Sequence, residues 1–527
     1  MHHTILDRSR RVCKFGARFL IAISAIPLIG NAQAAENAWF EIARTSITTD
    51  ELSSHVHFLA DDTLEGREAG SRGGHAAAKY LVDYLQKSEL SPAGTNGSFV
   101  QLFRGSSQNI LAILPGSDPQ LKNEYLLIGA HYDHVGYGNR HNSYGPFGFI
   151  HNGADDNASG VSALLELVDA LTRTAHRPRR SILIAFWDGE EKGLLGSAHW
   201  IKQPTVPRSA VKLCVNVDMV GRLTDGRIEV GGTRSGAGLR RLLSSSQLTS
   251  AWLDFNWEYK NNSDHWTFYQ ARIPSIYVHT GLHDDYHRPS DDVEKINVSG
   301  IQLVTGYLLE QVETLADTEV LPEFRAGAWL DNSDSKRRLE QPLPTLASRL
   351  SFTWKSSAAD PHRVEVGQVL VADSPLRQGD EIVAVNEQPI ANGQDLESIA
   401  IGSDNSLRLT VKRTGNDEPL VVEVPLQGSP VRLGLSWRED TAEPQTVFIT
   451  RVVPHSPAAR AGFELGDRIT ALEGESFADR QELLDRVQAL LAEAAKSIQF
   501  DVESRGVLHP ITVPLSPAAV PSSDTTL

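Results

Sequence analysis

The stretch YLLIGAHYD, residues 125–133, is an apolar run that stops abruptly at two polar residues, His131 and Asp133. A continuous apolar run of this length predicts a strand that is buried on both faces, as in the parallel sheet of an α/β protein. Sheets of this kind bind their ligands at the carboxyl ends of the strands. Residues two apart on a strand share a face, so Asp133 is predicted to accept a hydrogen bond from one ring nitrogen of His131. The other ring nitrogen is then left to face a ligand.

The segment NGADDNASG, residues 152–160, precedes a helical pattern over residues 161–171. Asp156 is therefore predicted to lie where a loop turns into a helix, at the positive end of the helix dipole. Three later apolar runs also end in carboxylates or histidines. These are residues 181–187 before Glu190 and Glu191, residues 211–217 before Asp218, and residues 274–280 before Tyr286 and His287. Strands that alternate with helices predict an α/β fold, here a three-layer sandwich around a mostly parallel central sheet.

Five of these side chains are candidate metal ligands: His131, Asp156, Glu191, Asp218 and His287. A set of histidines and carboxylates without thiolates suits Zn²⁺, and cobalt and manganese also tolerate it. Two ions about 3.5 to 4 Å apart need a bridging carboxylate. We predict that Asp156 is the bridge, with His131 and Asp218 on one ion and Glu191 and His287 on the other.

Glu190 lies beside a predicted ligand without being one, which makes it the candidate general base. It would take the proton of a water shared by the two ions and return it to the leaving amine. Tyr286 precedes a predicted ligand, and its hydroxyl is the candidate donor to the oxyanion of the tetrahedral intermediate.

This combination of residues resembles a known family, the secreted di-zinc aminopeptidases of bacteria, which are relatives of glutamate carboxypeptidase and glutaminyl cyclase. The matching motifs all occur in family order between residues 48 and 315. They are His131-x-Asp133, Asp156-Asn157-Ala-Ser-Gly, Glu190-Glu191-x-Gly-Leu, Asn216-x-Asp218-Met and Tyr286-His287. The resemblance implies a fold of the zinc exopeptidase type, two zinc ions on the five named ligands, Glu190 as the base, and a cis peptide bond between Asp156 and Asn157.

Several other polar residues near these motifs are predicted to have supporting roles. The loop over residues 134–151 is longer than a minimal loop of the family. The charges of the glycine-rich segment over residues 64–74 are interpreted as solvated, and contact with substrate is the alternative. Asp264 and His265 are expected near the rim of the pocket, with either a structural role or a contact to substrate. The histidines interpreted as loop or supporting residues, and not as further ligands, are His134, His141, His151, His279 and His283.

The first 34 residues predict a secretory signal peptide. Five basic residues precede an apolar run over residues 19–30, and Ala32 and Ala34 form a small-x-small cleavage site. The run is short for a permanent membrane anchor, so none is expected. Cleavage after Ala34 removes five basic residues and one acidic residue, which changes the formal net charge from −16 to −20. A chain this acidic is not expected to bind nucleic acid, and we expect it in the periplasm or the medium.

Cysteine usage is sparse. Cys13 leaves with the predicted signal peptide and Cys214 remains alone, so no internal disulfide is expected. Because Cys214 lies in an apolar run, we interpret it as an inert buried thiol.

Beyond residue 345 the chain repeats itself. RLSFTW at residues 349–354 corresponds to RLGLSW at 432–437, and GDEIVAVNEQ at 379–388 corresponds to GDRITALEGE at 466–475. The two β-rich modules resemble PDZ domains. The second is the better match, because the segment at Leu433 is similar to the loop that takes a peptide carboxylate on backbone amides. The first module is shortened, and its small helix is predicted to be missing.

These observations divide the chain into six predicted segments. They are a signal peptide (1–34), a di-zinc peptidase domain (35–321), a linker (322–345), a shortened PDZ-like domain (346–430), a PDZ domain (431–516) and a disordered tail (517–527).

The predicted function is that of an exported metallo-aminopeptidase that hydrolyses the first peptide bond of peptides with a free N-terminus. A C-terminal peptide is the expected ligand or substrate of the second PDZ domain, and packing of the PDZ-like modules against the catalytic domain is the alternative. Within the same superfamily, the alternatives are a carboxypeptidase or an enzyme like glutaminyl cyclase. Outside it, the alternative is a peptide-binding PDZ adaptor whose hydrolase domain is silent.

Overall fold

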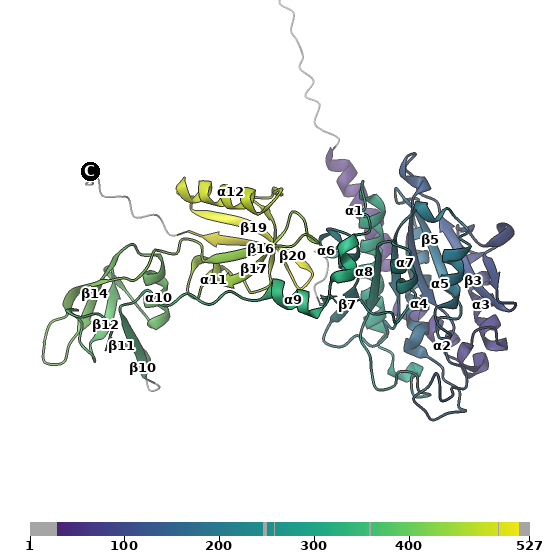
Figure 1. The fold of residues 1–527 in the computed structure, drawn as a ribbon, viewed down its shortest axis with the longest axis horizontal. Coiled ribbons are helices and arrows are strands. Elements are labelled where there is room, and N and C mark those ends of the chain that lie inside the picture. The colour runs from purple at the N-terminus through teal and green to yellow at the C-terminus, as the bar shows by residue number, and fades with distance from the viewer. Residues whose placement is uncertain (1–28, 246–249, 258, 358–359, 494, 516–527) are drawn as a thin grey trace, which may run out of the picture.

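The structure, a computed structural model, describes all residues except 1–28, 246–249, 258, 358–359, 494 and 516–527. The predicted signal peptide as far as residue 28 and the predicted C-terminal tail lie outside the described residues, and residues 29–34 belong to helix α1 (Ile29–Ser46). Figure 1 shows a large α/β domain and two small β-rich modules in a row. Within the part of the chain that the structure describes, no helix has both the length and the apolar character needed to cross a bilayer.

The α/β domain is built on a nine-stranded sheet of mixed direction. Its central strands are parallel, in the order β5 (Ser181–Trp187), β4 (Tyr125–His131), β6 (Val211–Val217) and β9 (Ser275–His279). On the two flanks, β3 pairs with β5 and β7 pairs with β9 in antiparallel fashion. The flanking strands are β1 (Ser91–Pro92), β2 (Val100–Phe103), β3 (Ser107–Leu114), β7 (Arg227–Gly231) and β8 (Trp252–Asn256). The predicted parallel order therefore holds for the four central strands, and the sheet as a whole is mixed.

Helices cover both faces of this sheet, which makes the predicted three-layer sandwich. Strand β4 shows why its sequence is continuously apolar: Leu126 and Ile128 contact one core, whereas Leu127 contacts a second core with Trp187 and Trp200. The first core lies under α1, α2 (Thr49–Leu59), α3 (Arg72–Leu85), α4 (Gly160–Thr172), α6 (Leu239–Leu243) and α8 (Val298–Asp317). The second lies under α5 (Leu195–Lys202) and α7 (His265–Gln270). Cys214, on β6, is 1% exposed in the second core, as predicted for an inert thiol.

The two β-rich modules have sheets with the same strand order. The first consists of β10 (Phe352–Ser357), β11 (Asp360–Val369), β12 (Glu381–Val385), β13 (Gln388–Pro389), β14 (Ser406–Lys412) and β15 (Leu420–Pro425), with α10 (Gly393–Gly402). The second consists of β16 (Leu435–Glu439), β17 (Val447–Val452), β18 (Arg468–Leu472), β19 (Ser497–Ser504) and β20 (Val507–Pro514), with α11 (Pro457–Ala461) and α12 (Arg480–Ala492). Helix α11 lies between β17 and β18, and the described residues between β11 and β12 contain no helix. Both sheets are consistent with PDZ-like folds.

The second module packs against the α/β domain. The backbones of Ser245 and Leu508 are joined by a hydrogen bond of 3.0 Å, and Leu253 donates to the Arg505 carbonyl at 2.8 Å. Arg240 on α6 forms an ion pair with Glu503 on β19, with nitrogen–oxygen distances of 2.8 and 3.0 Å. The structure thus shows that the second module packs against the catalytic domain, as one of the two predicted arrangements stated.

The segment predicted as a linker is partly ordered. It contains a short 3-10 helix, Ala326–Leu330, and helix α9 (Ser333–Glu340). Trp329 packs on Tyr269 with ring centroids 4.3 Å apart, and Arg234 donates to Asp331 at 2.9 Å. These contacts fix the start of the segment to the α/β domain.

Candidate metal centre

The structure brings the five predicted ligands together at the carboxyl ends of the central strands. The parallel direction of these strands is the reason, because their ends meet at one edge of the sheet. His131 ends β4, Asp218 follows β6, Glu191 lies in the turn after β5, and His287 lies in the turns after β9. Asp156 lies in the π-helical turn Ala154–Ser159 that leads into α4.

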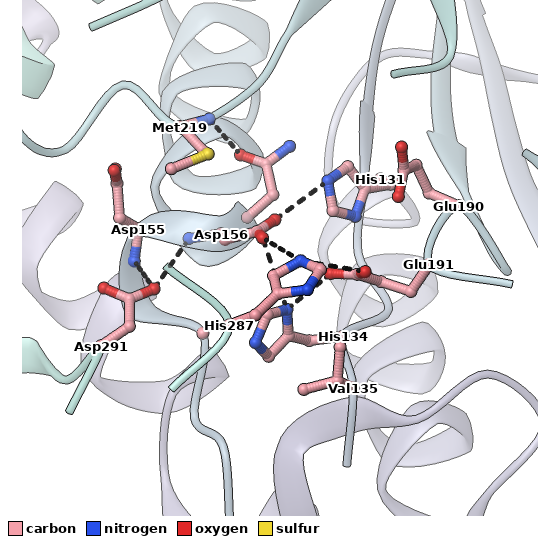
Figure 2. Close-up of polar contacts among 12 residues, drawn as sticks. His131, His134, Val135, Asp155, Asp156, Glu190, Glu191, Met219, His287 and Asp291 are labelled. Carbon is pink, nitrogen blue, oxygen red and sulfur yellow. Dashed lines mark hydrogen bonds and ion pairs between the residues drawn. The ribbon is translucent and has the colours of Figure 1, made fainter. Parts of the chain in front are cut away.

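Asp156 is shared by two groups of possible metal donors (Figure 2). In the first group, Nε2 of His131 lies 3.3 Å from Oδ1 of Asp156 and 3.2 Å from Oδ1 of Asp218. In the second group, Nε2 of His287 lies 3.1 Å from Oδ2 of Asp156 and 3.1 Å from Oε2 of Glu191. The two oxygens of one carboxylate thus face different histidines, which is the arrangement expected of a bridging ligand.

His134 belongs to the second group, although its sequence position was interpreted as a supporting one. Its Nδ1 lies 2.8 Å from Oε1 of Glu191 and 3.8 Å from Oδ2 of Asp156, and the side chain is fully buried. Figure 2 shows its ring below that of His287, with which it makes an edge contact. The structure therefore places the His134 ring among the possible metal donors, which its position in a loop did not indicate.

The electrostatics of the cluster favour positive charge. Burial alone would lower the pKa of His287, but Glu191 and Asp156 outweigh it and raise that pKa to about 11. Burial likewise opposes the charged form of His131, yet Asp218 and other carboxylates hold its pKa well above the ordinary value. A site in which carboxylates pull protons onto both histidines is a site suited to cations.

Asp133 does not make the contact predicted for it. Nδ1 of His131 lies 3.1 Å from the backbone carbonyl oxygen of Asp133 and 3.9 Å from its carboxylate. The carboxylate instead accepts the backbone N–H of Glu190 at 3.0 Å. The strand ends at His131, so the two-residue periodicity no longer holds at Asp133. The His131 ring is therefore oriented by the backbone, while Asp133 positions the candidate base.

Two side chains hold Asp156 in place: Asp291, which the sequence did not single out, and Asn157, which belongs to the motif of Asp156. The carboxylate of Asp291 accepts the backbone N–H groups of Asp155 and Asp156, at 3.0 and 3.1 Å. The side-chain oxygen of Asn157 accepts the N–H groups of Gly160 and Met219, at 3.0 and 3.1 Å, which ties the turn to the end of β6. The peptide bond between Asp156 and Asn157 is cis, as the family resemblance implied.

Arg67 lies beneath the cluster, in an environment that differs from the one predicted for its segment. It comes from the glycine-rich segment whose charges were expected to be solvated, but it is 1% exposed. Its guanidinium donates to the carbonyl groups of Leu59, Tyr132, Asn152 and Gly153, at 2.6 to 3.0 Å. Burial lowers the pKa of Arg67 to about 10, which keeps it charged at neutral pH. A lone arginine in a glycine-rich loop gives no signal of this role, because its partners lie as many as 86 residues away.

The two candidate catalytic side chains lie at the edge of the cluster. Glu190 is half-buried beside His131 and belongs to neither donor group. Burial raises its pKa well above the ordinary value, and the charges of Glu191 and Asp264 add to the effect. The Tyr286 ring stacks on His287 with centroids 3.9 Å apart. Burial and the nearby carboxylates raise the pKa of its hydroxyl, so Tyr286 keeps its proton.

The remaining histidines lie outside both donor groups, as predicted. His151 contacts Ser143 at 2.7 Å, His279 pairs with Glu229, His283 pairs with Asp155, and His141 is exposed.

Asp264 and His265 are both fully buried and do not form a rim. Asp264 accepts a hydrogen bond from Ser197, and burial raises its pKa to about 6. A structural role therefore fits these two residues.

An α/β domain that gathers buried histidines and carboxylates into two adjoining donor groups at its strand ends has the architecture of a metal-dependent hydrolase. Comparison with known families agrees with this class. Residues 109–312 match the family model described as Peptidase family M28, and residues 448–502 match that of the PDZ domain. Residues 109–312 thus resemble an M28 peptidase domain and residues 448–502 a PDZ domain, which confirms the resemblance seen in the sequence.

Individual relatives cover only parts of the chain. It is 30% identical to leupeptin-inactivating enzyme 1 of Streptomyces exfoliatus over 176 residues, which are 32% of this chain and 36% of that protein. It is 29% identical to aminopeptidase YwaD of Bacillus subtilis over 225 residues, which are 40% of this chain and 45% of that protein. Among solved structures, the LapA aminopeptidase of Legionella pneumophila matches 53% of this chain and 74% of its own, with 19% identity and a TM-score of 0.44. The chain thus spans less than half the length of these two curated relatives.

Proposed function

We propose that this chain is an exported zinc aminopeptidase that hydrolyses the first peptide bond of peptides with a free N-terminus. The observation that carries the proposal is the position of Asp156, whose two oxygens face His131 and His287. The peptidase family of the domain and the aminopeptidase name of the Bacillus subtilis relative support it.

Two zinc ions fit the residues that are present. Four donors at about 2.0 to 2.1 Å from a tetrahedral ion lie about 3.3 to 3.4 Å from one another. Oδ1 of Asp156 lies 3.3 Å from Nε2 of His131, and Oδ2 of Asp156 lies 3.1 Å from Nε2 of His287. Nε2 of His131 lies 3.2 Å from Oδ1 of Asp218. When bound, the ions would polarise the scissile carbonyl and lower the pKa of water from about 15.7 toward 7.

Glu190 is proposed as the general base. Its carboxylate would take the proton of the attacking water and then, as the acid, deliver it to the nitrogen of the leaving amine. A raised pKa suits both transfers, because the carboxyl group can then hold the proton between them. Asp133 is proposed to act through Glu190, since it accepts the backbone N–H of that residue.

Tyr286 is proposed to donate a hydrogen bond to the oxyanion of the tetrahedral intermediate. Its phenol stays protonated in this environment, and its ring is fixed by stacking on His287.

We also propose that residues 1–34 direct export to the periplasm or the medium. For the PDZ domain, we propose that a C-terminal peptide adds to β16, which is an edge strand of its sheet. Residues 433 and 434 precede this strand and, together with its first residue Leu435, would receive the peptide carboxylate.

The function can be tested with the purified full-length mature chain and a panel of substrates. We expect turnover of aminoacyl anilides with a free amino group, loss of turnover when the amino group is blocked, loss after chelation, and recovery with Zn²⁺. Removal of C-terminal residues from acidic dipeptides would indicate a carboxypeptidase, and cyclisation of N-terminal glutamine would indicate a cyclase. An absence of turnover for all substrates, with retained peptide binding, would indicate an adaptor.

A further inference from the structure

The two donor groups that share Asp156 are unequal. The first offers His131, Asp156 and Asp218, whereas the second offers His134, Asp156, Glu191 and His287. The extra member is His134, which lies outside the five-residue set predicted from the sequence. The question is therefore whether its ring is a ligand or a neighbour of one.

The contacts of His134 are those of a ligand. Neither ring nitrogen of His134 makes a hydrogen bond to any described residue, and neither does Oε1 of Glu191, although all three atoms are buried. Buried polar atoms are rarely left without a partner, because the cost is about 1 to 3 kcal/mol each. Yet Nδ1 of His134 and Oε1 of Glu191 lie only 2.8 Å apart. Both atoms belong to the donor group around Asp156, so a cation held by that group would give each of them a partner.

The surrounding backbone is built to place this ring. Gly153 has a φ of +56°, and a Cβ at that position would lie 2.5 Å from Cδ2 of His134. A side chain at 153 would therefore occupy the space of the imidazole. Arg67 fixes both sides of this space, because its carbonyl accepts the N–H of His134 and its guanidinium donates to the carbonyl of Gly153.

We propose that His134 is a sixth metal ligand, which closes the second position with four protein donors and leaves the first position, on His131 and Asp218, as the open one. Sites with four protein ligands are typically structural, and sites with three keep a place for water or substrate. The second position would then bind its ion more tightly, and the first would be the one that exchanges with substrate. This inference deepens the proposed function and rests on its metal centre.

The test measures metal binding without substrate. The full-length chain is stripped of metal and titrated with Zn²⁺ by calorimetry, and with Co²⁺ by visible absorption. For the unmodified chain we expect two separate binding steps. In His134→Ala, the tighter step should weaken on the order of a hundredfold or more, since even the loss of a supporting partner costs about 10- to 100-fold. His134→Asp, which keeps a ligand atom, should recover part of that loss and part of the Co²⁺ spectrum.

A matched control is His151→Gln, a buried histidine of the same loop that lies in neither donor group. It should keep both binding steps, and circular dichroism should show that every variant is folded. Unchanged steps in His134→Ala, or weakening of the looser step alone, would overturn the proposal. Because no substrate is used, a chain without aminopeptidase activity would refute the proposed function and leave this result intact.

Discussion

The guanidinium of Arg67 donates from Nε to the backbone carbonyl of Tyr132, at 2.9 Å, and so holds the chain between His131 and Asp133. The same group reaches the carbonyls of Asn152 and Gly153, on the segment that carries Asp156. One buried cation therefore joins the two segments that carry the candidate ligands His131 and Asp156.

Replacing Arg67 by lysine should impair the metal centre, although the charge is kept. An ammonium group cannot reproduce the planar fork that meets four carbonyl groups. A displacement of about 1 Å at a catalytic site costs on the order of 10²-fold in rate, and we expect a loss of this size in kcat/KM. Steady-state kinetics and Zn²⁺ affinity measure the effect.

The control for that change is Arg72→Lys, an exposed arginine of the same segment. It should leave kinetics and zinc affinity unchanged. Normal activity in Arg67→Lys would show that the guanidinium does not set the geometry of the site.

Glu190→Ala should abolish turnover and leave the metal in place. General bases contribute about 10²- to 10⁴-fold to rate, and Glu190 is outside both donor groups. The measurements are kcat on an aminoacyl anilide and zinc content by elemental analysis. Retained activity would remove Glu190 as the base, and lost zinc would make it a ligand.

Asp156→Asn should remove at least one of the two ions. An amide offers one oxygen in place of two, so it cannot face both His131 and His287. We expect a stoichiometry of one zinc or fewer per chain by elemental analysis, with activity lost. Two tightly bound ions in this variant would contradict the bridging role.

Docking of the PDZ domain should depend on pH through Glu503. Burial alone would raise its pKa, but the charge and hydrogen bonds of Arg240, together with Arg468, lower it to about 2. Because this lies below the ordinary value of 4.5, the carboxylate stabilises the folded chain fully above pH 4.5. The contribution is lost as the pH falls through about 2.

Glu503→Gln should therefore destabilise the chain by about 3 kcal/mol at pH 7, the cost of breaking a buried ion pair. The difference in thermal unfolding between this variant and the unmodified chain should shrink from pH 4.5 to pH 2. Glu475→Gln, which removes an exposed partner of Arg486, should have no measurable effect. If the difference in thermal unfolding between Glu503→Gln and the unmodified chain did not change with pH, Glu503 would carry no charge in the interface.

The parts of the site that could be predicted from sequence are those set by local pattern. The apolar run before His131 predicted both a strand and its end, and the same pattern located Glu191 and Asp218. Parallel central strands then explain why these residues meet. The shared role of Asp156 was predicted because two adjacent ions need a carboxylate that offers both of its oxygens.

The parts that could not be predicted depend on contacts between distant segments. His134 differs from the other loop histidines because its ring lies among the donors around Asp156, in space that Gly153 leaves free. The partners of Arg67 lie on three separate segments. For Asp133, the prediction assumed strand periodicity, but Asp133 lies two residues beyond the end of β4 at His131.

The single buried thiol of Cys214 has a consequence for how the chain matures. Without a cysteine partner, the described domains need no oxidase or disulfide isomerase to reach their final covalent state. Their folding therefore involves no thiol oxidation, whether the compartment is reducing or oxidising. Dithiothreitol should leave their melting temperature unchanged.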